Sequence, residues 1–150
     1  MSPQNTDITD AELVERFPYA RVDHDTKHLY RGWLERRLLV NRCGDCGHWH
    51  HPPKPVCPKC LSDHLEPTQV SGRGEVYLTM LIHQGPPAPE VDYAKGPHPV
   101  VTVELEEQPG LRITSTVLDG PDAAVIGTPV ELAWTERHGV PFPAFKKREG

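Results

Sequence analysis

The 150-residue sequence lacks long apolar runs and lacks an excess of positive charge. No stretch reaches the roughly 18 apolar residues of a membrane-spanning helix, and the polar N-terminus, MSPQNTDITDAELVE, has no apolar signal-peptide core. We therefore expect a soluble, cytoplasmic protein. With 16 Lys and Arg against 21 Asp and Glu, the formal charge of −5 argues against a general nucleic-acid binder, which usually carries a basic face.

Aromatic residues are also few, at 3 Phe, 4 Tyr and 3 Trp, and several lie in patterns typical of buried positions. Proline and glycine are abundant, at 17 and 12, which predicts prominent loops and few long helices. A chain of this length can bury one ordinary core, or one small core beside a metal-stapled module. We favour two small modules.

The sequence shows no arrangement typical of an active site. Catalysis would need a nucleophile beside a base, or paired carboxylates. Ser115 has no nucleophile-elbow context, and His83, His98 and His138 are scattered among loops and strand ends. We therefore expect no catalytic residues in this chain.

All four cysteines lie in one stretch, RCGDCGHWHHPPKPVCPKCLS, from Arg42 to Ser62. They form two Cys-x-x-Cys pairs, Cys43 with Cys46 and Cys57 with Cys60. Each pair presents two thiolates on one side of a tight turn, and Gly44 and Gly47 suit the sharp backbone there. Four thiolates converging on one point predict a zinc ribbon that holds one structural Zn per chain.

Two disulfides, or a redox-active pair as in thioredoxin-like proteins, are the alternatives. A reducing compartment disfavours stable disulfides, and a redox motif would not need a second copy. Four cysteine ligands leave no open position for water, so catalytic zinc is not expected. A nearby histidine could replace one ligand, although polar surface is the expected role of His48, His50, His51 and His64.

Two helices are predicted before the cysteines. Thr9 and Glu12 form a capping box, Leu13, Val14 and Phe17 give that helix an apolar edge, and Pro18 ends it. A second helix over residues 25–35 carries a stripe at four-residue spacing. The stripe consists of Leu29, Tyr30, Trp33 and Leu34. We expect it to pack either on its own domain or on a partner protein or ligand tail.

The remaining chain predicts strands. Residues 37–42 lead into the first cysteine pair and residues 65–71 lead out of the second. Further strands are expected at 74–83, where Gly74 permits a strong bend, and at 99–106, 111–118, 130–136 and 142–145. Residues 84–98 form an extended loop and 119–126 a crossover with a short helical turn. Five strands with one long loop predict an OB-type barrel, with another small barrel as the alternative.

Four motifs occur together in this order: Cys43 to Gly47, Pro52 to Cys60, Ser71 to Tyr77, and Gly127 to Val130. With the N-terminal helix, this set resembles the zinc-ribbon plus OB-fold proteins that accompany acyl-CoA enzymes, a family once catalogued as a domain of unknown function. The resemblance covers residues 30–145. It implies a mainly β chain with N-terminal helices at 1–36, a rubredoxin-like zinc ribbon at 37–70 and a five-stranded OB-fold barrel at 71–150.

Members of this family associate with thiolase-fold enzymes, including lipid-transfer-protein-like aldolases that cleave steroid side chains as CoA thioesters, and with MaoC-like enoyl-CoA hydratases. The resemblance therefore implies a non-catalytic subunit that helps form the acyl-CoA channel of a hetero-oligomeric lyase or acyltransferase. A retro-aldol partner is the first expectation, and a thiolase or hydratase partner is the alternative. A protein that binds single-stranded nucleic acid is a further, less favoured alternative.

Contact with CoA would require cations for its phosphates. Basic residues gather in sequence around the second helix and the ribbon, although a solvated surface would look the same. Lys54 stands where the family often has Arg, so a phosphate there would meet a point-like cation. The candidate contacts with CoA or a partner are Trp33, Arg36, Arg37, Trp49, Lys54 and Lys59.

Overall fold

The computed structural model describes residues 8–86 and 91–149, which form two compact units. The first comprises the chain as far as Val70 together with His138–Phe142. The second comprises Ser71–Arg137 and the chain from Pro143 onward. No helix among the described residues is long and apolar enough to cross a membrane.

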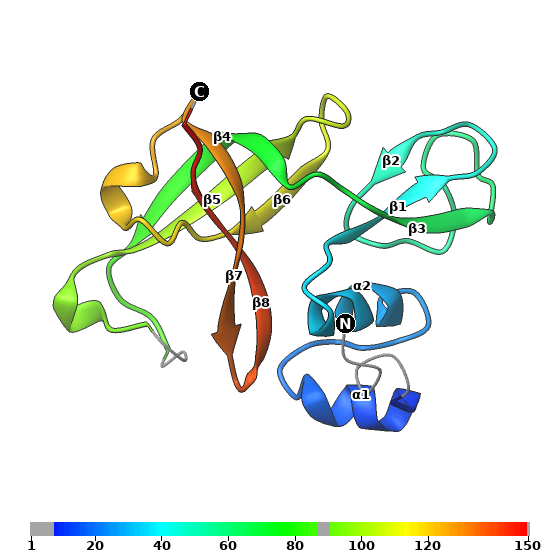
Figure 1. The fold of residues 1–150 in the computed structure, drawn as a ribbon, viewed down its shortest axis with the longest axis horizontal. Coiled ribbons are helices and arrows are strands. Elements are labelled where there is room, and N and C mark those ends of the chain that lie inside the picture. The colour runs from blue at the N-terminus through cyan, green and yellow to red at the C-terminus, as the bar shows by residue number, and fades with distance from the viewer. Residues whose placement is uncertain (1–7, 87–90, 150) are drawn as a thin grey trace. The chain divides into compact units, whose positions relative to one another are not determined.

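The first unit begins with the two predicted helices, α1 (Asp10–Arg16) and α2 (Lys27–Leu34) (Figure 1). The capping box is present, because the Thr9 hydroxyl accepts from the Glu12 amide at 3.2 Å and the Glu12 carboxylate accepts from the Thr9 amide at 2.7 Å. Asp10 of α1 holds the Arg31 guanidinium of α2 at 2.6 Å. The first turn of α1 therefore also fixes one helix against the other.

The apolar stripe of α2 lies mostly inside the first unit. Leu29 and Leu34 are buried, and the core cluster around Leu34 is formed by Leu13, Phe17, Leu34 and Val140. Trp33 packs against it, with ring centroids 5.9 Å from Phe17 and 5.6 Å from Phe142. The stripe thus packs on its own domain, and a ligand tail is not needed to cover it.

The ribbon is a three-stranded antiparallel sheet in the order β2-β1-β3. Its strands are β1 (Leu39–Cys43), β2 (Trp49–His50) and β3 (Leu65–Gln69). The short strand β2, for which no strand was predicted, forms because Asn41 and Arg42 of β1 pair with it. Strand β1 ends at Cys43, so the central strand delivers the first thiolate.

The second unit contains a five-stranded antiparallel sheet in the order β6-β5-β4-β7-β8. The strands are β4 (Arg73–Ile82), β5 (His98–Leu105), β6 (Arg112–Ser115), β7 (Pro129–Arg137) and β8 (Val140–Lys147). A parallel bridge between Val117 and Phe145 joins the segment after β6 to β8. This closure of the curled sheet gives the OB-fold arrangement and confirms the predicted fold class.

The alternation predicted for β5 is confirmed, since Val101, Val103 and Leu105 are buried. Gly74 is needed for the close approach of β4 to β5, because a Cβ there would lie 2.4 Å from the carbonyl oxygen of Glu104. Strand β8 is twice as long as predicted. The loop prediction for 84–98 falls partly on residues 87–90, which lie outside the described residues; its later part contains a 3₁₀ turn, Tyr93–Lys95, and a second turn occupies Pro121–Ala123.

Candidate metal centre and its surroundings

The two Cys-x-x-Cys turns have the same backbone hydrogen bonds. The amide of Gly47 donates to the carbonyl of Cys43 at 2.9 Å, and the amide of Leu61 donates to that of Cys57 at 2.9 Å. Cys43 and Cys57 also donate their own amides to the carbonyl five residues on, at 2.9 and 2.8 Å. Gly47 and Leu61 have φ of 76° and 64°. A left-handed residue therefore follows each pair, and in the second turn it is a leucine.

These turns bring the four sulfurs together. The Sγ atoms of Cys43 and Cys60 are 3.6 Å apart, those of Cys46 and Cys57 are 3.7 Å apart, and all four lie within 4.8 Å of one another. A disulfide requires about 2.05 Å, so the four are free thiols. Within the described ranges, this metal-ligating group contains no histidine. Ligand replacement by histidine is therefore not supported.

Ionisation of the four thiols also fits a bound cation. The Cys46 amide donates to the Cys43 sulfur at 3.5 Å and helps lower the pKa of Cys43 to about 6. Cys60 accepts from the Ser62 amide, which favours its thiolate, but burial and the neighbouring sulfurs raise the pKa of Cys60 to about 12. A bound cation would favour the thiolate of Cys60 against this shift. The donor set and its spacing suit structural Zn²⁺.

A side-chain cluster that the sequence did not indicate links the two turns. Asp45 of the first turn accepts hydrogen bonds from the hydroxyl of Ser62 and, at 3.0 Å, from Nδ1 of His64. The Ser62 hydroxyl also accepts from the His64 amide at 3.0 Å. These bonds, with Ser62 first, lower the pKa of Asp45, and Asp45 raises the pKa of His64. The cluster therefore acts as a clamp that links the two turns of the ribbon. The Ser62 hydroxyl donates to Asp45 and not to the His64 ring, so the serine and histidine do not form a nucleophile–base pair.

Two of the histidines expected at the surface are inside the ribbon. His50 is 6% exposed, and its Nε2 lies 3.4 Å from the Asn41 amide nitrogen. Nδ1 of His51 is buried with no hydrogen-bond partner. Burial lowers the pKa of His51 to about 4. The surface expectation is therefore wrong for His50, and His51 is only partly exposed. Burial favours the neutral form of both rings by lowering the pKa of each.

The six candidate contact residues are not brought to one place. Trp33 belongs to the aromatic core cluster of the first unit, and its indole nitrogen is buried. Trp49 lies under the Arg42 guanidinium, 5.1 Å from its ring centroid. Arg37 donates to Gln69 at 3.1 Å and to Glu35 at 3.4 Å.

The other three, Arg36, Lys54 and Lys59, are exposed, and none makes an ion pair with another described residue. Lys54 borders a small polar hollow of about 130 Å³ beside His24, His28 and Asn41. These cations remain available to an anionic ligand or partner.

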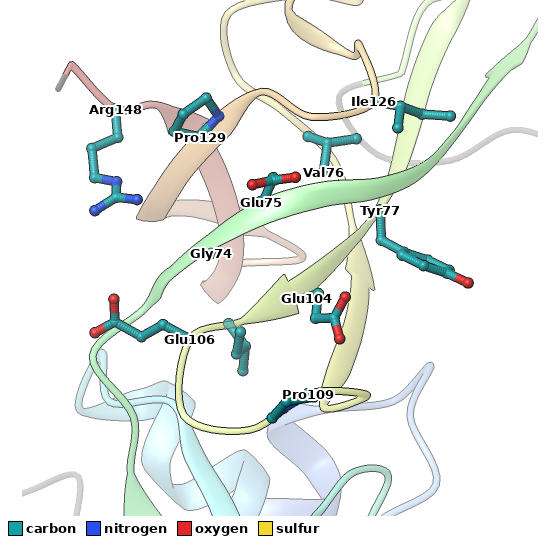
Figure 2. A pocket seen from close by; sticks show the side chains of 11 residues that line it. Gly74, Glu75, Val76, Tyr77, Glu104, Glu106, Pro109, Ile126, Pro129 and Arg148 are labelled. Atoms are coloured by element: carbon teal, nitrogen blue, oxygen red, sulfur yellow. The ribbon is translucent and has the colours of Figure 1, made fainter.

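A larger open hollow of about 540 Å³ lies on the barrel over the start of β4 (Figure 2). Two of its three carboxylates are engaged: Glu106 pairs with Arg73, which lowers the pKa of Glu106, and Glu104 accepts from the Gly110 amide. The third, Glu75, also lines the hollow. Its described lining includes no histidine, cysteine or serine. Ser115, elsewhere on the barrel, donates to the Pro143 carbonyl at 2.6 Å and is not paired with a histidine.

Four converging cysteines on a small antiparallel sheet, followed by a curled five-stranded sheet of the OB type, define the class of zinc-ribbon and OB-fold proteins. Residues 31–66 match the family described as "ChsH2, rubredoxin-like zinc ribbon domain", and residues 67–135 match "ChsH2, C-terminal OB-fold domain". The chain belongs to this ChsH2 (DUF35) family, as the resemblance of its motifs predicted.

Relatives in other organisms support the assignment. A "DUF35 domain-containing scaffold protein" of Methanocaldococcus jannaschii is 36% identical over 115 residues, which cover 72% of this chain and 77% of that protein. A "Probable enoyl-CoA hydratase alpha subunit" of Thermomonospora curvata is 34% identical over 134 residues. The match covers 89% of this chain but 40% of that protein, so the chain spans about two fifths of its length.

Two solved structures share the fold. A chain of the "Ltp2-ChsH2(DUF35) aldolase" is 32% identical with a TM-score of 0.75, over 85% of this chain and 98% of that one. A DUF35-family protein of unknown function from Sulfolobus solfataricus is 14% identical with a TM-score of 0.59, over 93% and 95% of the two chains. The latter likeness concerns the fold alone.

Proposed function

We propose that this chain is a non-catalytic accessory subunit of a thiolase-fold acyl-CoA enzyme, foremost a lipid-transfer-protein-like aldolase. The observation that carries the proposal is the likeness, at 32% identity and nearly full coverage, to the ChsH2 chain of an Ltp2–ChsH2 aldolase. In this role the ribbon and barrel stabilise the enzyme and help form its acyl-CoA channel. The reaction of the complex is retro-aldol cleavage of a steroid side-chain hydroxyacyl-CoA.

The chemistry of the chain supports an accessory role. The four cysteines fill a tetrahedral site, so a bound zinc keeps no position for water or substrate. Of the three carboxylates in the barrel hollow, Glu106 and Glu104 are already committed to Arg73 and Gly110, and Glu75 has no histidine, cysteine or serine beside it among the described lining residues. A general acid or base needs a group that is free to exchange its proton with substrate. The catalytic groups are therefore supplied by the partner.

Exposed cations of the ribbon would contact the CoA phosphates. Arg36, Lys54 and Lys59 are solvent-exposed and uncommitted to described carboxylates. Trp33 and Arg37, in contrast, are already engaged within the first unit. Lys54, on the loop between the cysteine pairs and beside a polar hollow, is the strongest candidate.

Co-expression tests the proposal. The chain is expressed with each thiolase-fold enzyme encoded in the genome that carries it, and each pair is purified through a tag on the chain. We expect one enzyme to co-purify and its aldolase activity on a hydroxyacyl-CoA to depend on the chain. If no thiolase-fold enzyme co-purifies, the proposal is wrong.

A MaoC-like hydratase complex is the second candidate, because the Thermomonospora curvata relative is described as a probable enoyl-CoA hydratase subunit. The same co-expression with hydratase-fold enzymes decides between the two. Hydration of an enoyl-CoA by the purified pair, with no aldolase activity, would favour this candidate.

A further inference from the structure

Strand β4 has one open edge. Strand β5 pairs with β4 along its length, from Gly74 to Ile82. On the other edge, β7 pairs with Arg73–Glu75, and the segment before β7 continues as far as Val76 through Gly127 and Thr128. Beyond that point, no described residue pairs with this edge from Leu78 to Ile82. The outward-facing amides and carbonyls there are available for a further strand.

The side chains around this edge are apolar and exposed. Leu78, Met80 and Leu81 are 51%, 53% and 44% exposed. The register places Met80 opposite Val100 and Leu81 opposite the buried Pro99, so both faces of the strand present apolar groups.

Val125 and Ile126 are also exposed and lie where the paired part of the edge ends, and Figure 2 shows Ile126 on the segment beside Val76. We call Leu78–Ile82 with Val125 and Ile126 the β4 edge surface.

The open part of strand β4 lacks the charged residues and prolines that usually protect a free edge. Proteins shield open edges with charged residues, especially lysine, with proline, or by covering them. The sequence from Val76 to Ile82, VYLTMLI, contains no charged residue and no proline. The register shift between Val76 and Leu78 lies before the open part and leaves five residues free beyond it. An edge of this kind is suited to pairing with another chain.

We propose that the β4 edge surface binds an extended, uncharged, apolar segment of the thiolase-fold partner, which adds to the sheet as a strand. Main-chain hydrogen bonds would supply affinity and the apolar side chains specificity. Because neither the edge nor the segment carries a charged side chain, pairing them buries no unpaired charge. This inference rests on the proposed function and adds the surface through which the partner is held.

The size of the surface favours a partner that is also bound elsewhere. A stable interface uses about 20 to 30 residues on each side, whereas the open edge provides Leu78–Ile82 and two neighbours. Pairing of two copies of this chain through the edge alone would bury too little. A subunit held at several places on the chain meets the requirement.

A charge placed in the edge tests the proposal. Met80→Lys puts an ammonium at a half-exposed strand position, and Val14→Lys makes the same change at a similarly exposed position on α1. Both variants should keep the wild-type melting temperature. With the enzyme identified by co-expression, we expect Met80→Lys to weaken binding at least about tenfold, since a lysine buried at an interface is costly. Val14→Lys should bind within about threefold of wild type.

Hydrogen exchange gives a second readout. The outward-facing amides of residues 78–82 should exchange rapidly in the free chain and become protected in the complex. Unchanged binding of Met80→Lys, or no new protection at 78–82 in a complex that does form, would overturn the edge inference while leaving the proposed function standing.

The remaining outcomes also decide. If the chain alone forms a dimer in light scattering that Met80→Lys dissociates, the edge binds a second copy and the proposal is wrong. If no thiolase-fold enzyme binds the wild-type chain, the proposed function fails, and this inference fails with it.

Discussion

Leu61 follows the second cysteine pair at the position that Gly47 occupies after the first pair. Both residues have positive φ, and the left-handed region costs a residue with a Cβ about 1–2 kcal/mol. Leu61 is 74% exposed, so its side chain contributes little burial. We expect Leu61→Gly to leave the free energy of unfolding unchanged or raise it by up to about 1 kcal/mol, because the relief exceeds the added chain entropy of glycine. Urea unfolding of the zinc-loaded protein measures it.

The reverse change is the matched control. Space around Gly47 is open, with the nearest atom to an added Cβ, from Arg42, at 3.9 Å. Gly47→Ala should therefore lose about 1 kcal/mol through backbone strain alone. A loss on Leu61→Gly as large as that on Gly47→Ala would contradict the account.

His51 should make the fold sensitive to acid. Its folded-state pKa of about 4 lies below the ordinary 6.5 because its ring is buried. Between these values the unfolded chain binds a proton that the folded chain does not, so stability falls as pH decreases from 6.5 towards 4. The full difference corresponds to about 3 kcal/mol. His51→Gln should lose less stability than wild type between pH 7 and pH 5 in urea unfolding.

Acid also protonates zinc-bound thiolates, so only the difference between variants reports on His51. His83 provides the control, because its side chain is exposed and its replacement removes no buried ring. His83→Gln should follow the wild-type pH dependence. A His51→Gln profile equal to that of wild type would show that the ring is solvated.

Among the elements, α1 depends on its cap. Thr9 and Glu12 satisfy each other's amides, and an N-cap threonine replaced by alanine typically costs about 1 kcal/mol. Thr9→Ala should reduce the free energy of unfolding of the first unit by this amount, measured by the urea dependence of tryptophan fluorescence from Trp33. Thr9→Ser keeps the hydroxyl and should remain within about 0.3 kcal/mol of wild type. Equal losses in the two variants would assign the effect to the threonine methyl group.

The elements that the sequence predicted are those with a local cause. The capping box lies within four residues, and the alternation of β5 reflects one buried face. Strand β8 was predicted too short because Pro141 and Pro143 interrupt its pattern. They are tolerated because β8 ends the order of the sheet, where a missing amide costs no ladder bond on its outer side.

Within the metal centre, the four cysteines were predictable from spacing, because each pair lies in one turn. The clamp was not, since Asp45 lies 17 residues from Ser62 and 19 from His64. The one sequence feature that indicated the clamp was the presence of short polar side chains, Asp45 and Ser62, beside the cysteine ligands of the two different turns. The burial of His50 and His51 was likewise missed, because it depends on pairing between β1 and β2.

At the scale of the molecule, contacts between residues distant in sequence determine which apolar side chains are buried, and local sequence patterns do not predict this. Val140 is buried in the cluster with Leu13 and Phe17, more than 120 residues earlier in the chain. Because such contacts fill the first unit, Leu29 and Leu34 of the α2 stripe are buried and Trp33 packs against the core. The exposed ribbon cations and the β4 edge surface are the surfaces that we propose for contact with a partner.

Removal of zinc should unfold the ribbon while the barrel remains folded. Structural zinc contributes about 10–16 kcal/mol of binding free energy, comparable to the entire stability of a domain, and the ribbon sheet has only three short strands. Cys57→Ser should lower zinc from about one equivalent per chain to near zero in elemental analysis. Amide signals of residues 37–70 should collapse in NMR spectra while those of the barrel strands persist, because the barrel has its own buried core of Val76, Val101, Val103 and Phe145. Lys59→Ala, in the same turn but without a ligand atom, should keep both zinc and signals. Retention of ribbon signals in zinc-free Cys57→Ser would show that hydrogen bonds such as the Asp45 clamp suffice to fold the ribbon.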